Sequence, residues 1–159
     1  MRRTLLISSL ALAGLLARPA TASADITAFL GFSPTPDTRS ARGLAVGVNL
    51  LIVGFEFEYS RTVEDALKGA PGLTTGMFNA MVITPTSAVQ LYATAGGGFF
   101  RERLLDESET NFGTNVGGGV KLTLAGPLRL RVDYRLFNLR GSPFFRNPHR
   151  FYTGISLSF

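Results

Sequence analysis

The chain has 159 residues, enough for one domain, with 16 Lys and Arg against 11 Asp and Glu and no cysteine. The lack of thiols excludes disulfides, thiolate metal sites and the acylated cysteine of a lipoprotein, and the single histidine excludes sites built from several histidines. Because Arg2, Arg3 and Arg18 fall in a segment that we expect to be removed, 13 basic residues remain against 11 acidic ones, and the charge predicts no nucleic-acid partner.

Residues 1–24 have the features of a secretory signal peptide. Arg2 and Arg3 precede an apolar stretch over 5–17, and small residues at Ala22 and Ala24 suit signal peptidase. The apolar stretch is shorter than the about 20 residues that a membrane-spanning helix needs. We therefore predict cleavage after Ala24 and a mature domain over 25–159, with a retained N-terminal anchor helix as the alternative.

Eight segments of the mature chain are predicted to be β-strands. They are roughly 25–33, 41–49, 52–60, 73–83, 88–100, 111–123, 128–137 and 150–159. In the third segment Phe55 and Phe57 share one face and Glu56 and Glu58 share the other, because a strand places alternate residues on opposite faces. The first, fourth and fifth segments alternate poorly, and the pattern does not assign their faces.

The last two segments alternate most clearly. In one, Leu128, Leu130, Val132, Tyr134 and Leu136 oppose Arg129, Arg131, Asp133 and Arg135. In the other, Phe151, Thr153, Ile155, Leu157 and Phe159 oppose Arg150, Tyr152, Gly154, Ser156 and Ser158. A helix would scatter these residues around its circumference, so the pattern favours strands with one apolar and one polar face.

The connections alternate between long and short. The long, polar ones cover 33–40, 61–72, 101–110 and 138–149, and the short ones cover 49–51, 84–87 and 125–127. Eight antiparallel strands would place both termini and all short turns at one end and all long loops at the other, which is typical of bacterial outer-membrane barrels. Helix is expected at most as one turn within 63–69.

The alternation fits either a soluble lipocalin-like barrel or a membrane barrel with the apolar face outside. The lumen of an eight-stranded barrel is just wide enough for side chains to fill it, and charges in a membrane require partners. We therefore predict an all-β, eight-stranded, antiparallel up-and-down transmembrane β-barrel. Its predicted lumen charge network consists of three carboxylates and five basic groups: Glu56, Glu58, Asp133, Lys121, Arg129, Arg131, Arg135 and Arg150. A soluble periplasmic binder remains the alternative.

The final residues carry a family resemblance. Thr153–Phe159 follows the pattern polar residue, glycine, two variable residues, apolar residue, variable residue and terminal aromatic. This pattern resembles the terminal β-signal of bacterial outer-membrane proteins. Its key positions are occupied by Gly154, Leu157 and Phe159. The mature chain is similar to the small outer-membrane barrels that include OmpX, the OmpA transmembrane domain and the opacity proteins. The resemblance implies an outer-membrane location, recognition by the outer-membrane assembly machinery and contact with outer-membrane lipid and lipopolysaccharide, and we expect a monomer. Tryptophan, common in the interfacial girdles of that group, is absent here, so Phe and Tyr must replace it.

We expect a non-enzymatic protein with a structural or surface-interaction role carried by its long external loops, and no cofactor or metal. A narrow transport pore and a lipid A-modifying membrane enzyme are the alternatives. Lipid A deacylases of similar size use a His-x-Ser pattern, whereas His149 is followed by Arg150 and Phe151. Arg101 and Arg103 are candidate contacts for lipopolysaccharide phosphates. Two glycine runs, 96–98 and 117–119, lack the context of a phosphate-binding loop and are expected to permit strand bending and make room for aromatic rings.

Overall fold

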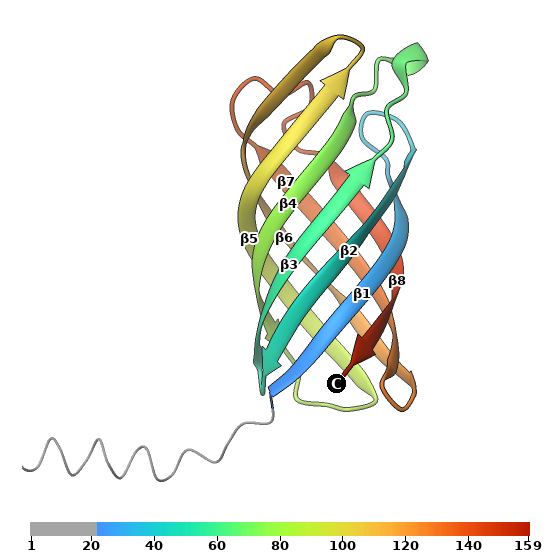
Figure 1. Cartoon of the computed structure of the whole chain (residues 1–159), viewed down its shortest axis with the longest axis vertical. Coiled ribbons are helices and arrows are strands. Elements are labelled where there is room, and N and C mark those ends of the chain that lie inside the picture. The colour runs from blue at the N-terminus through green and yellow to red at the C-terminus, as the bar shows by residue number, and fades with distance from the viewer. Residues whose placement is uncertain (1–21) are drawn as a thin grey trace, which may run out of the picture.

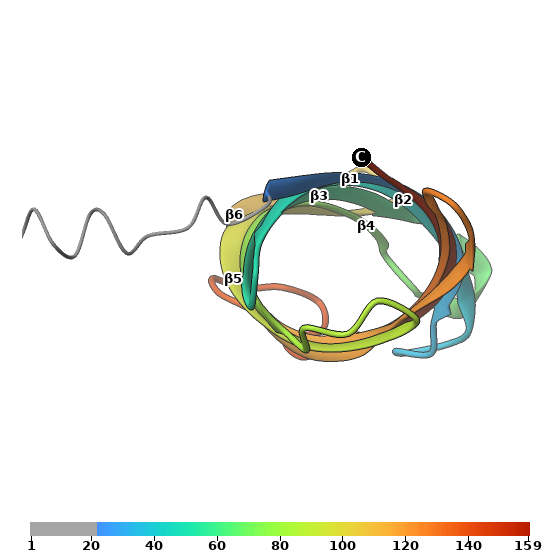
Figure 2. The ribbon, with the colours of Figure 1, turned by 90° about the horizontal axis from the view of Figure 1, so that it is seen from below.

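The computed structural model describes residues 22–159, which form a closed barrel of eight strands (Figure 1). The strands are β1 (Ala22–Ser33), β2 (Arg39–Leu50), β3 (Val53–Thr62), β4 (Gly72–Ile83), β5 (Val89–Leu104), β6 (Glu107–Ala125), β7 (Leu128–Leu139) and β8 (His149–Ser158). Each strand pairs antiparallel with the next, and β8 returns to pair with β1. Figure 2 shows the resulting closed ring along its axis. The predicted up-and-down topology is confirmed, and closure leaves no sheet edge unpaired.

The first and last strands meet at one end of the barrel. The backbone N–H of Ala24 donates to the carbonyl of Phe159 at 2.7 Å, and Phe159 returns the bond to Ala24 at 2.9 Å. The cleavage predicted after Ala24 therefore falls within β1, which begins at Ala22. The rest of the predicted signal peptide, residues 1–21, lies outside the described residues, so cleavage stays a prediction.

The connections separate the two ends of the barrel, as Figure 1 shows. Residues 51–52, 84–88 and 126–127 form the connections at the end where the C-terminus lies, and we call this the turn end. Residues 34–38, 63–71 and 140–148 form the longer loops at the opposite end, the loop end. The helical turn expected within 63–69 is present as a short 3₁₀ helix, η1 (Ala66–Lys68).

One expected loop is a continuation of the sheet. Residues 101–110 were predicted to be a long loop, but β5 and β6 run through them to a tight turn at Leu105 and Asp106. Leu105 adopts a left-handed backbone with φ of 53°. The prediction was wrong because the segment is polar on both faces, a pattern that resembles a loop but also suits a hairpin standing in water.

The barrel is apolar outside and polar inside. Phe55 and Phe57 are 57% and 41% exposed on the outer face of β3, while Glu56 and Glu58 between them are 5% and 0% exposed. The same sense holds in β8, where Leu157 is exposed outside and Ser156 is buried inside. The structure thus has the orientation predicted for a membrane barrel and the reverse of a soluble one. Among residues 22–159, no helix is long and apolar enough to cross a membrane.

The glycine runs have the structural role expected of them. A Cβ at Gly119 would lie 2.5 Å from the hydroxyl of Tyr92, and a Cβ at Gly97 would lie 2.8 Å from the ring of Phe112. Both positions therefore leave room for an aromatic ring on a neighbouring strand, one inside the barrel and one outside.

Candidate functional site: the lumen and the outer rim

The middle of the lumen holds a cluster of buried charges, which we call the ionic layer. Its members are all at most 5% exposed, and three of them are alternate residues of β7: Glu56, Glu58, Arg131, Asp133, Arg135 and Arg150. Three carboxylates thus face three guanidinium groups. Burying a charge is costly unless it is paired and hydrogen-bonded, so the arrangement of partners decides whether this layer stabilises the barrel.

Arg131 occupies the centre of the ionic layer. Its Nη1 and Nη2 atoms both donate to the carboxylate of Glu56, the second at 3.2 Å, and Nη2 lies 3.1 Å from Asp133. Its Nε donates at 2.8 Å to the hydroxyl of Tyr92, which in turn donates to Asp133. The guanidinium therefore has a partner for each of its nitrogens.

Arg135 joins the two glutamates of β3 to β7. Its Nη2 lies 2.9 Å from Glu56, its Nη1 lies 3.3 Å from Glu58, and its Nε lies 3.1 Å from Asp133. Each of these carboxylates also binds a second basic group or a tyrosine. Such a cross-linked set ties β3, on one side of the ring, to β7 on the other.

Arg150 completes the ionic layer from β8. It donates to Glu58 and to the hydroxyl of Ser60. Its guanidinium carbon also lies 5.0–5.4 Å from the ring centroids of three inward aromatic residues, Phe29, Phe137 and Tyr152. Guanidinium groups are favoured over aromatic faces at such distances, so Arg150 joins the charges to the apolar part of the interior.

A separate ion pair lies nearer the turn end. Lys121 Nζ is 2.5 Å from the carboxylate of Asp25, and both side chains are buried. Asp25 also accepts a hydrogen bond of 2.8 Å from the amide of Asn49. With this pair, the interior ion pairs join four carboxylates to four basic groups and are neutral as a set.

The eight predicted lumen charges are not all brought together. Seven lie inside and form ion pairs, but Arg129 is half-buried near the turn end and donates to Gln90 at 2.5 Å instead. Asp25 takes part in its place and was missed, because the first segment alternates poorly and Asp25 lies at its start. Tyr92 was missed for the same reason, whereas Tyr152 shares its face with Arg150 and could have been found.

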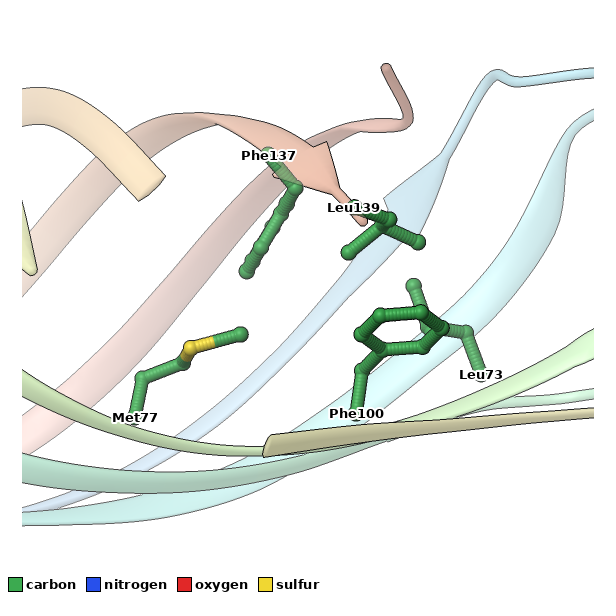
Figure 3. Close-up of a cluster of buried hydrophobic side chains, with 5 residues drawn as sticks. All are labelled: Leu73, Met77, Phe100, Phe137 and Leu139. Carbon is green, nitrogen blue, oxygen red and sulfur yellow. The ribbon is translucent and has the colours of Figure 1, made fainter. Parts of the chain in front are cut away.

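Apolar side chains fill the lumen nearer the loop end. This apolar plug consists of five buried residues from β4, β5 and β7, which point toward one another across the lumen in Figure 3: Leu73, Met77, Phe100, Phe137 and Leu139. Each is at most 6% exposed. Inward apolar residues on β4 and β5 explain why these segments alternate poorly, since both faces carry apolar side chains.

Loop 140–148 is held against the β5–β6 hairpin by two carboxylates. Glu102 accepts a hydrogen bond of 2.8 Å from the backbone N–H of Phe144, and Glu109 accepts one of 2.6 Å from Ser142. Both glutamates belong to the part of the β5–β6 hairpin that was expected to be a loop. The hairpin thus positions the last external loop, and Phe144 remains 38% exposed at its surface.

Two other loops of the loop end are joined by an exposed ion pair. Lys68 Nζ lies 2.7 Å from the carboxylate of Asp37, which connects η1 to loop 34–38. The hydrogen bond from Lys68 holds the pKa of the Asp37 carboxyl below its usual value, and the same contact raises the pKa of Lys68. The pair is fully exposed to solvent, so its effect on stability is small.

Four arginines gather on the outside of the barrel near the loop end. Arg42, Arg61, Arg101 and Arg103 are all exposed and line a shallow pocket of about 550 Å³ over β2 to β5. Within residues 22–159, none of the four forms a salt bridge or a side-chain hydrogen bond. We call these four residues the outer-rim cluster. It includes both of the candidates predicted from the sequence, Arg101 and Arg103.

The only histidine binds a tyrosine through its ring, and its backbone carbonyl accepts a hydrogen bond of 2.7 Å from the hydroxyl of Ser33. His149 Nδ1 lies 2.6 Å from the hydroxyl of Tyr134, and both residues are half-buried on the outer face. Within residues 22–159, the hydrogen bond of the His149 ring goes to Tyr134 and not to a carboxylate or a serine hydroxyl, which are the partners that a His–Ser acyl-transfer site uses. In the part of the chain that the structure describes, no three metal-binding side chains cluster either.

The comparisons with known proteins show the fold. Neither a protein-family model nor a curated protein matches the sequence. Solved structures are similar to it, among them Neisserial surface protein A, with 17% identity, a TM-score of 0.65 and coverage of 87% of this chain and 96% of that one. The N-terminal β-barrel domain of Pseudomonas aeruginosa OprF has 17% identity, a TM-score of 0.64 and coverage of 86% and 97%. The outer membrane enzyme PagL has 13% identity, a TM-score of 0.55 and coverage of 84% and 98%. The chain therefore has the fold of the small outer-membrane barrels, a fold shared by a surface protein and an enzyme.

Proposed function

We propose that this protein is a monomeric, non-enzymatic barrel of the bacterial outer membrane, with a structural or surface-interaction role carried by its external loops. The eight strands span the bilayer with their apolar rows against lipid. The turn end faces the periplasm, and the loop end faces the outside. The variable working surface comprises loops 34–38, 63–71 and 140–148 and the tip of the β5–β6 hairpin.

The filled lumen carries this proposal. The Asp25–Lys121 pair, the ionic layer and the apolar plug follow one another along the interior, and each is built from buried side chains. A transport pore needs a continuous wet path, and an eight-stranded barrel has no spare width once side chains fill it. The observation therefore favours a sealed scaffold over the narrow pore.

The assembly role of the last strand is part of the same proposal. Leu157 on the outer wall of β8 and Phe159, directly after that strand, are 48% and 72% exposed, where an assembly factor has access to them. Gly154 faces inward, and a Cβ there would lie 2.8 Å from the side chain of Phe29. We assign these three residues to the signal read by the outer-membrane assembly machinery, with Gly154 kept small by packing as well.

Contact with lipopolysaccharide is the second part of the interaction surface. Arg101 and Arg103 point outward from β5 in the outer-rim cluster, where lipid phosphates lie if the barrel spans the membrane. Changing both to Gln should weaken binding of lipopolysaccharide to the purified barrel. The control is Arg140→Gln/Arg146→Gln, which removes the same charge from loop 140–148 and should have a smaller effect. If the unchanged barrel and both variants bind lipopolysaccharide equally well, Arg101 and Arg103 do not contact it.

Three measurements on the purified protein test the proposed function. The barrel should fractionate with the outer membrane and migrate differently on a gel before and after heating, as a folded barrel resists detergent until heated. In planar bilayers it should show no steady, reproducible open state, and incubation with lipid A should release no acyl chain. Extraction without detergent would favour the soluble binder. Steady conductance would favour the pore, and loss of acyl chains from lipid A would favour the enzyme.

A further inference from the structure

A long apolar groove runs down the outer wall beside the outer-rim cluster. It has a volume of about 770 Å³ and is lined by residues of β8, β1, β2 and β3 and by Leu130 of β7. Its floor includes Ala28, a small outward residue, and the next residue, Phe29, is flanked by its cross-strand partners Gly43 and Gly154. A Cβ on Gly43 would collide with the ring of Phe29, so the glycine leaves that ring uncovered. Because Phe29 is itself held by stacking on Tyr152 at 4.0 Å, the floor is fixed.

Larger apolar residues form the sides of this groove. Ala28 is paired with Leu44 on β2 and with Ile155 on β8, and Leu44 is paired in turn with Tyr59 on β3. All of these residues face outward. The groove is therefore a depression one side chain deep between two ridges, which is a shape that accepts a hydrocarbon chain lying along the wall.

Two arginines stand at the loop end of the groove. Arg42 and Arg61 line both the groove and the shallow pocket of the outer-rim cluster. They are direct cross-strand partners on β2 and β3, two residues nearer the loop end than Leu44 and Tyr59. Like charges directly opposite each other on a sheet repel, and no carboxylate among residues 22–159 forms a salt bridge with either one. An anion between them would remove the repulsion.

The row of direct cross-strand partners continues from β3 to β5. Arg61 pairs with Thr74 on β4, and Thr74 pairs with Arg101 on β5. Below this row the outer wall is apolar, with Phe57 and Phe78 in contact on β3 and β4 at 4.9 Å between ring centroids. Positive charge directly above an apolar wall marks the depth at which lipid headgroups meet hydrocarbon.

From these observations we infer that the Arg42–Arg61 pair and the groove below it form a binding site for one phosphorylated outer-leaflet glycolipid, lipid A. A phosphate lies between the two guanidinium groups, and an acyl chain lies over Ala28 between the Leu44 and Ile155 ridges. The inference rests on the proposed function, because it needs the loop end of the barrel to face the outer leaflet. It adds residues of β1, β2, β3 and β8 to a surface so far assigned only to Arg101 and Arg103.

The chemistry of the site selects this occupant over others. Guanidinium groups bind phosphate through paired, charge-assisted hydrogen bonds, and two facing arginines suit a dianionic phosphate monoester better than a monoanionic diester. The groove supplies the hydrocarbon contact that a soluble anion would lack. The position of the arginines at the loop end places them in the leaflet that carries lipid A if the proposed orientation holds.

Two variants separate the halves of the site. Arg42→Gln/Arg61→Gln removes the phosphate contacts, and Ala28→Leu fills the groove from its floor. Arg140→Gln/Arg146→Gln is the charge-matched control, since both residues are exposed in the last loop. Ala95→Leu is the size-matched control, because Ala95 is also a small outward residue, on β5 and outside the groove. All four changes lie on exposed surface, so the barrel should fold.

The probe is diphosphorylated lipid A added to the purified barrel in detergent, with native mass spectrometry counting bound lipid. Dephosphorylated lipid A and phosphatidylglycerol are the comparison lipids. We expect one lipid A per barrel, at least about tenfold weaker retention in each site variant, and unchanged retention in each control. Dephosphorylated lipid A and phosphatidylglycerol should also be retained at least about tenfold less by the unchanged barrel.

The site would be overturned if Ala28→Leu or Arg42→Gln/Arg61→Gln retained as much lipid A as the unchanged barrel. It would also be overturned if the unchanged barrel retained phosphatidylglycerol more tightly than lipid A, or if the control variants lost as much lipid A as the site variants. Heat-modifiable migration is recorded for every protein in the same preparation. If the barrel folds and inserts but its lipid selectivity does not change when Ala28, Arg42 or Arg61 is replaced, only the assignment of the groove fails. If the unchanged barrel does not insert, the proposed function fails first.

Discussion

The ionic layer and the apolar plug fill neighbouring parts of one lumen by opposite means. In the ionic layer, Arg131 and Glu56 are buried only because each has its partners in place. In the plug, Met77 and Phe100 need only contact and volume. An incomplete charge network leaves a buried ion without a partner, whereas an incomplete apolar cluster leaves a void. The two regions should therefore respond differently to the loss of a single side chain.

The largest effect is expected in the ionic layer. Arg131→Met should lower the free energy of unfolding by about 3–5 kcal/mol, because it leaves Glu56 and Asp133 buried without their main cation. Urea unfolding in lipid vesicles measures this. Arg146→Met, which removes an exposed arginine, should change stability by no more than about 0.5 kcal/mol. Similar stabilities for the two variants would contradict the account of the ionic layer.

The apolar plug should tolerate a change of shape better than a loss of volume. Met77→Ala should cost about 2–5 kcal/mol in the same unfolding experiment, since it opens a cavity among Leu73, Phe100 and Phe137. Met77→Leu keeps the volume and should cost less than about 1.5 kcal/mol. If both variants lose the same stability, packing volume is not what holds this part of the lumen together.

The isolated ion pair allows the comparison to be made within one site. Lys121→Met leaves Asp25 unpaired, and adding Asp25→Asn removes that charge while keeping an acceptor for Asn49. The double variant should be more stable than Lys121→Met alone, with a coupling energy of about 1–3 kcal/mol. Additive losses in this double-mutant cycle would show that the pair is not coupled.

The smallest effect is expected at the exposed Asp37–Lys68 pair. The hydrogen bond from Lys68 lowers the pKa of Asp37 in the folded protein, so Lys68→Gln should raise that pKa toward its ordinary value of 3.8. The contact is therefore fully present above pH 3.8 and is lost as the pH falls through the lower folded pKa. A carboxyl NMR titration of both proteins gives the two midpoints, and identical midpoints would show that the pair does not form in solution.

The sequence predicts the fold and the ionic face far better than the apolar plug. Through the middle of β3, β7 and β8 the charged residues share one face and the apolar residues share the other, so the period of two identifies both strand and orientation; nearer the loop end, Arg61 lies on the outer face and Phe137 on the inner one. In β4 the inward Met77 and Met81 are as apolar as the outward Phe78, and the pattern cannot separate the faces. The alternation places Arg129 on the lumen face but does not show that its partner is Gln90, and Asp25 was missed because the first segment alternates poorly.

The loop end was the least predictable part of the chain. Residues 101–110 lie at the loop end, where water on both sides removes the need for alternation, so strand and loop have the same composition. The pairing of Arg42 with Arg61 depends on the register between β2 and β3, which the separate segments do not encode in any local pattern. The outer-rim cluster therefore emerges only from the folded barrel, although two of its members were singled out beforehand.

The outward direction of the apolar rows is tested most directly by a cysteine scan along β3. The chain has no cysteine, so a single spin label can be placed at each position of residues 53–62 in turn, in barrels inserted into lipid vesicles. Labels at Phe55 and Phe57 should collide freely with oxygen, which dissolves in lipid, and hardly with a water-soluble nickel complex. A label at Phe57 that is open to the nickel complex and protected from oxygen would contradict an outer wall in contact with lipid.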